Sequence, residues 1–254
     1  MCTILLAYRV NRRWPVIIGN NRDEFYDRPA VPPRVFAAEA GGERWLAPID
    51  LAAGGSWWAC NRHGLLVCLT NRWHGELREV GLVSRGQLVR ELVRCADPAA
   101  ARRQLAATSL AAFSPFNLLV AGKAEAFLFS NYPEPLELPL APGFHFLGNG
   151  PLRRDDSLKA RMAAREFAAL ENRRVKEKRE ILAAFARLLR LSLPQEWIPP
   201  QGFNVSLDGY GTTSSTLLAL GDGPAAAALN LAYATGNPLR VPFRDYSPLG
   251  RLLF

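Results

Sequence analysis

The sequence has few of the side chains that bind metals or form redox centres. Its 254 residues include four cysteines, three histidines and two methionines. The histidines His63, His74 and His145 stand far apart, and no two cysteines have the spacing of metal ligands. We therefore expect no metal site, and we expect the thiols to stay reduced, as in most cytoplasmic chains.

Long apolar runs are also missing. No stretch approaches the ~20 consecutive apolar residues of a membrane helix. The apolar segment behind Met1 is short, and no basic segment precedes it, unlike a secretory signal. These absences favour a soluble, cytoplasmic protein with no integral membrane association.

Positive charge is abundant but not clustered. The chain carries 31 Lys and Arg residues against 23 Asp and Glu, a formal net charge of +8. Most arginines are interleaved with Glu or Ala, as in "KARMAAREF" (159–167) and "ENRRVKEKRE" (171–180). Because this pattern is typical of solvated helix faces, we expect no nucleic-acid partner.

The composition that remains is that of a globular protein. Hydrophobic residues make up 49% and charged residues 21% of the chain, and no internal repeat or low-complexity linker is visible. We therefore predict a single domain over residues 1–254.

Hydrophobic periodicity predicts strands and helices in alternating groups. Strands are expected over 2–10, 15–21, 56–61, 65–71, 116–122, 126–131, 136–140, 144–150, 213–221 and 226–236, and helices over 84–95, 98–107, 157–171 and 177–191. Ser84 and Asp97 are placed to cap the first two helices. The four prolines within residues 28–53 instead predict a long irregular segment.

Hairpins dominate this order, which favours antiparallel sheets over βαβ units. Two facing sheets with a layer of helices on each outer side would accommodate the elements. A simpler α+β arrangement would fit the periodicity as well.

Cys2 follows the initiator methionine directly. If Met1 is removed, one residue carries both a thiol and a free α-amine, and the amine can serve as the general base for the thiol near neutral pH. The alternative is an ordinary cysteine at the start of a strand. Cys60, Cys68 and Cys95 are expected to be small buried hydrophobic residues.

Several motifs occur together along most of the chain. They are "MCT", "GNNRDEFYDRP", "DLAAGGSWWACNRHGLLVCLTNR", "SRGQL", "FNLLVAG", "LGNG" and "YGTTSST". Together they resemble the NRDE family, also called the Transport and Golgi organization family. That family resembles the N-terminal-nucleophile (Ntn) hydrolases of the penicillin V acylase and bile-salt hydrolase type. The resemblance implies an α+β fold, a four-layer αββα sandwich.

The resemblance also implies roles for individual residues. Cys2 falls on the nucleophile, and Asp23 falls on the aspartate beside the nucleophile's amine, where a carboxylate can orient that amine. Arg22 would hold this carboxylate or a substrate anion. A structural ion pair between Arg22 and Glu24 at a strand end is an equal alternative.

Two asparagines fall near amides that line the acylase site. Asn71 and Asn149 could each direct an amide N–H at an oxyanion, although asparagine is also common in turns. The alignment leaves Thr70 as a substitute for Asn71. Thr213 stands where many family members have an arginine, so either a different arginine fills that role or the chain does not cut an amide.

Further residues are assigned to binding. Trp57 and Trp58 would line a pocket for an acyl chain or a flat macrocycle, although core packing is the more common role of such aromatic residues. Asn21, Glu24, Tyr210 and Ser214 are assigned to binding because they belong to the shared motifs.

Two functions follow from this resemblance. The first is a cysteine hydrolase of amide or acyl bonds that uses Cys2 and needs no cofactor. The second is a non-catalytic carrier of haem or an acyl lipid, such as an acyl-CoA, in the same cavity. The ligand would be a small amide, an acyl compound or haem. The sequence indicates neither the substrate nor the oligomeric state.

Overall fold

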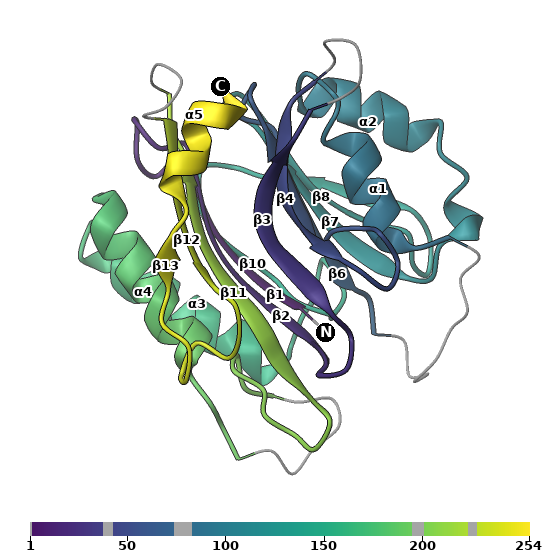
Figure 1. The fold of residues 1–254 in the computed structure, drawn as a ribbon. Coiled ribbons are helices and arrows are strands. Elements are labelled where there is room, and N and C mark those ends of the chain that lie inside the picture. Colours follow the sequence, from purple (N-terminus) through teal and green to yellow (C-terminus); the bar gives the residue numbers. More distant parts are fainter. Residues whose placement is uncertain (1, 38–42, 74–82, 195–200, 223–227) are drawn as a thin grey trace.

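The computed structural model is a sandwich of two β-sheets between two layers of helices (Figure 1). It describes residues 2–37, 43–73, 83–194, 201–222 and 228–254. This α+β, four-layer arrangement confirms the predicted fold class.

The first sheet has six strands in the order β10-β1-β2-β11-β12-β13, and each neighbouring pair is antiparallel. Its strands are β1 (Cys2–Tyr8), β2 (Val16–Phe25), β10 (Gly143–Leu147), β11 (Tyr210–Leu220), β12 (Leu229–Ala234) and β13 (Arg244–Asp245). The strand that begins with Cys2 therefore lies inside the sheet, between β10 and β2.

The second sheet has seven strands in sequence order from β3 to β9, again all antiparallel. They are β3 (Ala30–Phe36), β4 (Trp45–Asp50), β5 (Trp58–Asn61), β6 (Leu66–Asn71), β7 (Phe116–Ala121), β8 (Ala126–Ser130) and β9 (Leu136–Pro139).

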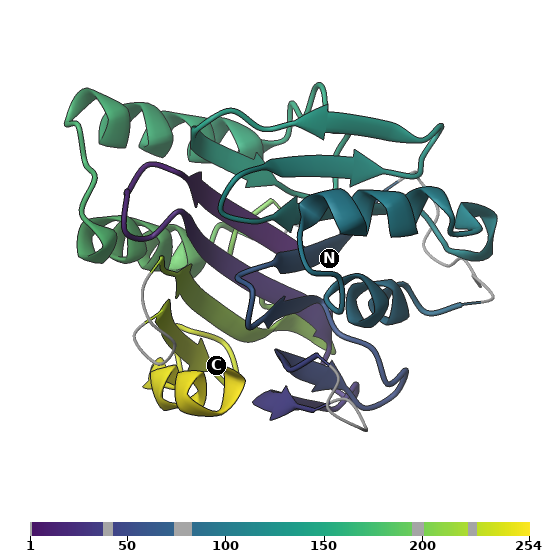
Figure 2. The same ribbon diagram turned by 90° about the horizontal axis from the view of Figure 1, so that it is seen from above.

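Helices cover the outer face of each sheet (Figures 1 and 2). The helices α3 (Leu158–Asn172) and α4 (Lys178–Arg190) pack on the first sheet, while α1 (Arg85–Leu92) and α2 (Pro98–Ala106) pack on the second. The C-terminal α5 (Gly250–Leu253) and two short 3₁₀ helices, Leu110–Ala112 and Ser247–Leu249, complete the described elements. None of the described helices is long and apolar enough to cross a membrane.

Side-chain alternation along β1 divides the core into layers. Ile4 and Leu6 belong to the cluster between the two sheets, whereas Leu5 and Ala7 pack under α3 and α4. Successive side chains of a strand leave the sheet on opposite faces. Cys2 therefore shares the inter-sheet face with Ile4, so its thiol faces the layer between the two sheets.

The prediction of an irregular segment over residues 28–53 is wrong, because β3 and β4 lie within it. β3 is the edge strand of its sheet, and its register shifts between Val31 and Arg34, where Pro32 and Pro33 lie. Proline is tolerated at sheet edges and bulges because no ladder N–H is required there.

The two predicted helix caps have different outcomes. The Asp97 carboxylate accepts a hydrogen bond from the Ala100 N–H at 2.7 Å, as expected of an N-cap. Ser84 occupies the N-cap position of α1, but its side chain makes no capping hydrogen bond. The first two residues of the strand expected over 226–236 lie outside the described residues.

Two of the quoted motifs contact each other at glycines. Gly55 of "AAGGSWW" lies so close to Gly86 of "SRGQL" that a Cβ on Gly55 would meet the Gly86 backbone at 2.6 Å. The Ser56 N–H also donates to the Gly86 carbonyl at 3.1 Å. A side chain at either glycine would separate α1 from the loop that precedes β5.

Candidate active site at the start of β1

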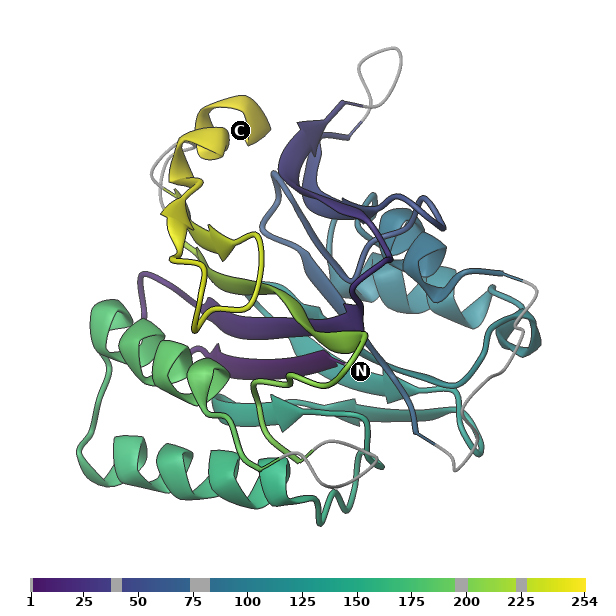
Figure 3. The same ribbon diagram turned by 60° about the horizontal axis from the view of Figure 1, so that its bottom comes forward.

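Cys2 is the first described residue of the chain and is nearly buried, with 8% of its surface exposed. It lies opposite Arg22 on β2, and Arg22 in turn lies opposite Ser214 on β11. Figure 3 shows this end of the sandwich, where the start of β1 lies beside β2, and β2 lies beside β11. Three motif residues from distant segments thus meet across adjacent strands.

Asn149 follows β10, the other neighbour of β1. Ile4 lies opposite Leu147, and extending this antiparallel register by two residues brings Asn149 level with Cys2. The Asn149 side-chain amide donates to the Asn71 carbonyl, and the Asn149 carbonyl accepts from the Trp73 N–H at 2.8 Å. These bonds hold the loop and use one of the two amide hydrogens of Asn149.

Asp23 lies one residue beyond the partner of Cys2 and is only 1% exposed. Its Oδ1 accepts a hydrogen bond from Thr212 Oγ1 at 2.7 Å, and Lys159 Nζ lies 3.7 Å from Oδ2. The Tyr210 hydroxyl donates to the Asp23 main-chain carbonyl at 3.0 Å. Burial raises the pKa of Asp23, and the Lys159 cation acts in the opposite direction.

The side chains of Cys2 and Asp23 leave the sheet on opposite faces. Asp23 contacts Lys159 of the helical layer, whereas the adjacent Arg22 shares the inter-sheet face with Cys2. The Asp23 carboxylate consequently lies on the face of the sheet opposite to the Cys2 thiol.

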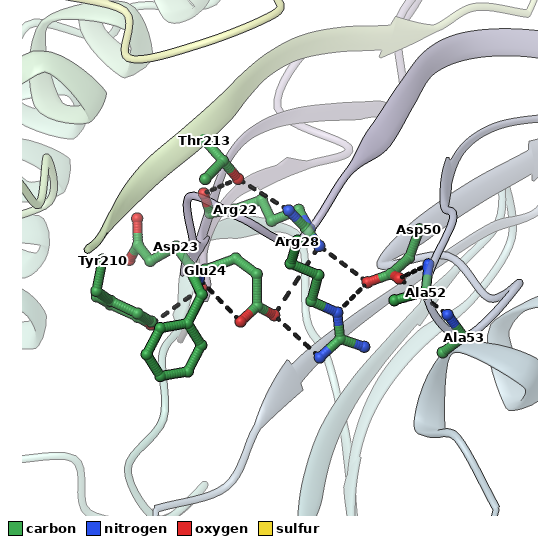
Figure 4. Close-up of polar contacts among 10 residues, drawn as sticks. Arg22, Asp23, Glu24, Arg28, Asp50, Ala52, Ala53, Tyr210 and Thr213 are labelled. Atoms are coloured by element: carbon green, nitrogen blue, oxygen red, sulfur yellow. Dashed lines mark hydrogen bonds and ion pairs between the residues drawn. The ribbon is translucent and has the colours of Figure 1, made fainter.

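Arg22 bridges the two sheets (Figure 4). Its Nη2 donates to Asp50 Oδ2 at 2.9 Å, its Nη1 donates to Thr213 Oγ1 at 3.0 Å, and its guanidinium lies 4.7 Å from the centre of the Trp57 ring. Arg22 is 3% exposed. Its buried carboxylate partner is therefore Asp50, a residue that the sequence did not single out.

Glu24 and Arg28 extend this network toward solvent. Arg28 Nε donates to Asp50 Oδ2 at 2.7 Å, and Glu24 Oε2 lies 3.6 Å from an Arg28 nitrogen and 3.9 Å from Arg22 Nη2. Arg22 therefore also forms the alternative ion pair with Glu24, but this contact is longer than its contact with the Asp50 carboxylate.

Thr213 completes the contacts of Arg22. Its hydroxyl accepts from Arg22 Nη1 and lies 3.2 Å from the Arg22 carbonyl, to which it can donate. Thr213, which stands where the family pattern has a second arginine, is thus hydrogen-bonded to Arg22 of β2.

Asn21 faces the helical layer. Its side-chain amide donates to the carbonyls of Leu189 and Phe203 at 2.9 and 3.0 Å, and its Oδ1 accepts from the Ser215 hydroxyl at 2.6 Å. Both amide hydrogens are used within the protein. Asn21 connects β2 to the end of α4, on the face opposite to the Cys2 thiol.

The second sheet presents Thr70 and Asn117 to the space between the sheets. They lie opposite each other on β6 and β7, and both donate to the Gly148 carbonyl, at 2.7 and 3.1 Å. Alternation along β6 places Asn71 on the other face. Sequence reasoning did not single out Asn117, although "FNLLVAG" carries it as an amide within an apolar strand.

The aromatic residues of the site pack mainly in the core. Trp57 and Trp58 are 5% and 0% exposed and belong to the inter-sheet cluster, and Trp58 Nε1 donates to Thr216 Oγ1 at 3.0 Å. The Tyr210 ring lies edge-on to Phe25 with centroids 5.3 Å apart. Ser214 is 4% exposed.

Burial raises the pKa of the Cys2 thiol. Burial also raises the pKa of the Cys68 thiol, with smaller contributions from Cys60 and Cys2. Cys60 and Cys68 are fully buried, as expected, whereas Cys95 is partly exposed. The described part of the chain holds no group of three or more His, Cys, Asp or Glu side chains placed to bind a metal ion.

A cavity of about 190 Å³ adjoins Asn149 and Lys159, and its lining also includes Arg72, Asp155 and Gln201. A cavity of about 370 Å³ lies at the other end of the sandwich, where the β1–β2, β5–β6 and β7–β8 turns meet. None of the site residues described above lines this larger cavity.

Solved structures with the same architecture cover nearly the whole chain. An N-acylethanolamine-hydrolyzing acid amidase ortholog from Caenorhabditis elegans is 18% identical, with a TM-score of 0.58, covering 89% of this chain and 96% of that one. Penicillin V acylase from Agrobacterium tumefaciens is 12% identical, with a TM-score of 0.56 and coverages of 98% and 88%. A variant of conjugated bile acid hydrolase from Clostridium perfringens is 10% identical, with a TM-score of 0.57 and coverages of 96% and 92%.

At these identities the likeness is one of fold, which is that of the Ntn hydrolases. No curated protein matches the chain in sequence. A family match is nevertheless clear, because residues 1–224 match the family described as Transport and Golgi organisation 2. The chain belongs to the Transport and Golgi organisation 2 family.

Proposed function

We propose that the protein is an N-terminal cysteine hydrolase of amide or related acyl bonds, active once Met1 is removed. The observation that carries this proposal is the placement of Cys2. It begins an inner strand, faces the inter-sheet layer beside Arg22, and has the buried Asp23 carboxylate one residue further along β2. Processing would create an α-amine on the residue that carries the thiol.

The reaction would proceed in two halves. The Cys2 thiol gives its proton to the α-amine of the same residue, and the sulfur attacks the substrate carbonyl carbon. The remaining amide hydrogen of Asn149 would donate to the oxyanion. The C–N bond then breaks, the ammonium returns the proton to the leaving amine, and water hydrolyses the thioester to release the acid and restore the thiol.

Met1 would keep this chemistry dormant. While Met1 is attached, the Cys2 nitrogen is an amide and cannot accept the thiol proton, and burial keeps the thiol protonated at neutral pH because its pKa is raised. Removal of Met1 supplies a base with a reference pKa of about 7.7–8.0 on the nucleophilic residue itself.

Support for an amide substrate comes from the similar structures. Their names describe an N-acylethanolamine-hydrolyzing acid amidase, a penicillin V acylase and a conjugated bile acid hydrolase. Only 8% of the Cys2 surface is exposed, so a substrate would approach Cys2 from the strand ends, where Phe25 and Tyr26 are exposed.

The test begins with the intact mass of the purified protein, which shows whether Met1 is present. Protein without Met1 should hydrolyse N-acyl aminocoumarins of some acyl length, and a quenched reaction should contain protein heavier by one acyl group. Cys2→Ala should abolish both signals, whereas Cys95→Ala should leave them unchanged. Release of aminocoumarin by Cys2→Ala at the native rate would refute the proposal, and so would processed native protein that cleaves no acyl length.

A carrier of haem or an acyl lipid is the competing proposal. It is favoured by the near-complete burial of Cys2, because a nucleophile must be reached by its substrate. Titration of processed protein with haem, followed by absorbance, and with a fluorescent acyl-CoA, followed by anisotropy, tests it. Saturable binding by a protein that forms no acyl-enzyme would favour the carrier, and unchanged signals would exclude it.

A further inference from the structure

Lys159 is a buried lysine that the sequence analysis assigned to a solvated helix face, and that assignment is wrong. Its side chain is 7% exposed, and its Nζ lies 3.7 Å from Oδ2 of Asp23, whose side chain has no exposed surface. A charged pair this deeply buried loses most of its hydration, so each ion depends on the other.

The position of Lys159 on its helix is unfavourable for a cation. It is the second residue of α3, where the aligned peptide dipoles disfavour positive charge, and the first turn of α3 contains no acidic residue. Ser157 caps this end by accepting from the Ala160 N–H. The local sequence of α3 therefore gives no reason for a lysine here, and Asp23 provides the compensating charge.

The surroundings of Asp23 show what this lysine adds. From β11, Thr212 donates to the carboxylate and Tyr210 donates to the Asp23 carbonyl. Its neighbours Arg22 and Glu24 on β2 are engaged with Asp50 and Arg28. From the helical layer, Lys159 supplies the cation that contacts the carboxylate. In the processed protein the terminal amine of β1 would be a second cation on the same carboxylate.

We propose that Lys159 is a positioning residue that holds the Asp23 carboxylate in place and offsets part of its negative charge beside the terminal amine of processed Cys2. This inference rests on the proposed function for its catalytic consequence, but not for the electrostatics of the site. A buried carboxylate that faced the amine alone would hold it as a strongly paired ammonium. With Lys159 present, the carboxylate shares its charge between two cations, so the amine gives up its proton more readily and can act as a base.

The direct test measures the electrostatics without any substrate. Processed protein is alkylated with iodoacetamide between pH 5 and 10, and the rate at Cys2 is followed by mass spectrometry. Lys159→Met removes one positive charge, so the midpoint of the Cys2 profile should move up by about one pH unit. Lys159→Arg keeps the charge and should restore the native midpoint.

A matched control uses the same helix. Arg161→Gln removes one positive charge from an exposed site two residues from Lys159 and should leave the midpoint unchanged. If Lys159→Met does not fold, Lys159→Gln removes the charge with a polar side chain, and the same shift is expected. A native midpoint in the folded charge-removal variant, or the same shift in Arg161→Gln, would overturn the inference.

Hydrolysis provides the second readout and separates the two proposals. In an active enzyme, the acidic limb of the kcat/KM profile should move to higher pH in Lys159→Met by the same amount as the alkylation midpoint, and Lys159→Arg should return it. If the native protein hydrolyses no substrate while the alkylation midpoint still shifts, the proposed function fails and the role of Lys159 stands. If hydrolysis occurs but neither pH profile shifts in Lys159→Met, the proposed role of Lys159 is refuted and the proposed function stands.

Discussion

A single methionine decides the chemical state of Cys2. The sulfur, the Arg22 guanidinium and the Asp23 carboxylate are placed by strand register, so removal of Met1 changes the chemistry of the site without rearranging these strands. The raised pKa of the Cys2 thiol in the unprocessed chain comes mainly from burial. Under the proposed function, the same thiol would belong to an inert core residue before processing and to a nucleophile beside a free amine after it.

Retention of Met1 should suppress alkylation of Cys2. A lysine inserted between Met1 and Cys2 would block removal of the methionine, and the buried thiol should then react with iodoacetamide at pH 8 about tenfold more slowly than in urea. Its rate should rise as the pH approaches the raised thiol pKa, because only the thiolate reacts. Processed protein serves as the control and should react faster. Equal rates at Cys2 in the two native proteins would contradict this prediction.

Residues identified by a motif were predicted more successfully than their partners. Cys2, Arg22 and Asp23 could be named from the sequence because they stand in short quoted stretches. Asp50 and Asn117 also stand in quoted stretches but were not singled out, because local sequence does not show which residues each contacts across the sheets. Lys159 lies outside every quoted motif. Lys159 was the hardest of these to find, since the Ala- and Arg-rich run around it has the pattern of an exposed helix.

Helices and strands were predicted well where periodicity was strong and poorly where proline interrupted it. The amphipathic α4 and the apolar β7 follow from their patterns, but β3 and β4 were missed. Their prolines occupy an edge strand with a register shift and a part of β4 beyond its pairing with β5, positions where the absent N–H costs little. Proline position relative to a sheet edge depends on the neighbouring strands, which local sequence does not reveal.

The two N-cap residues form a matched pair for a stability measurement. Asp97→Ala removes the 2.7 Å hydrogen bond to the Ala100 N–H and should lower the free energy of unfolding by about 1 kcal/mol. Ser84→Ala removes a side chain without a capping bond, so its effect should stay within about 0.5 kcal/mol. Urea denaturation followed by circular dichroism measures both. A larger loss for Ser84→Ala than for Asp97→Ala would contradict the cap assignment.

The two sheets are joined at the site end by polar contacts as well as by the apolar layer. Arg22 of the first sheet reaches Asp50 at the end of β4, and the Asp50 Oδ1 also accepts from the N–H groups of Ala52 and Ala53. Clusters of buried apolar residues fill most of the inter-sheet core and of both helical layers. The Arg22–Asp50 pair therefore stands out as a buried charged link that fixes one sheet against the other beside Cys2.

Removing one partner of this link should therefore destabilise the whole sandwich. Asp50→Asn leaves the 3% exposed Arg22 without its carboxylate, and loss of one partner from a buried pair costs about 3–5 kcal/mol. Glu24→Gln removes a carboxylate at 3.9 Å with a more exposed side chain and should cost less than about 1 kcal/mol. The double variant Arg22→Met/Asp50→Asn should recover part of the loss, because no uncompensated charge at Arg22 remains. Urea midpoints of the native protein, Asp50→Asn, Arg22→Met, the double variant and Glu24→Gln measure these differences. A double variant that loses the full sum of its single variants would show that Arg22 and Asp50 stabilise the sandwich independently, and the link between the sheets would then lie in the apolar layer alone.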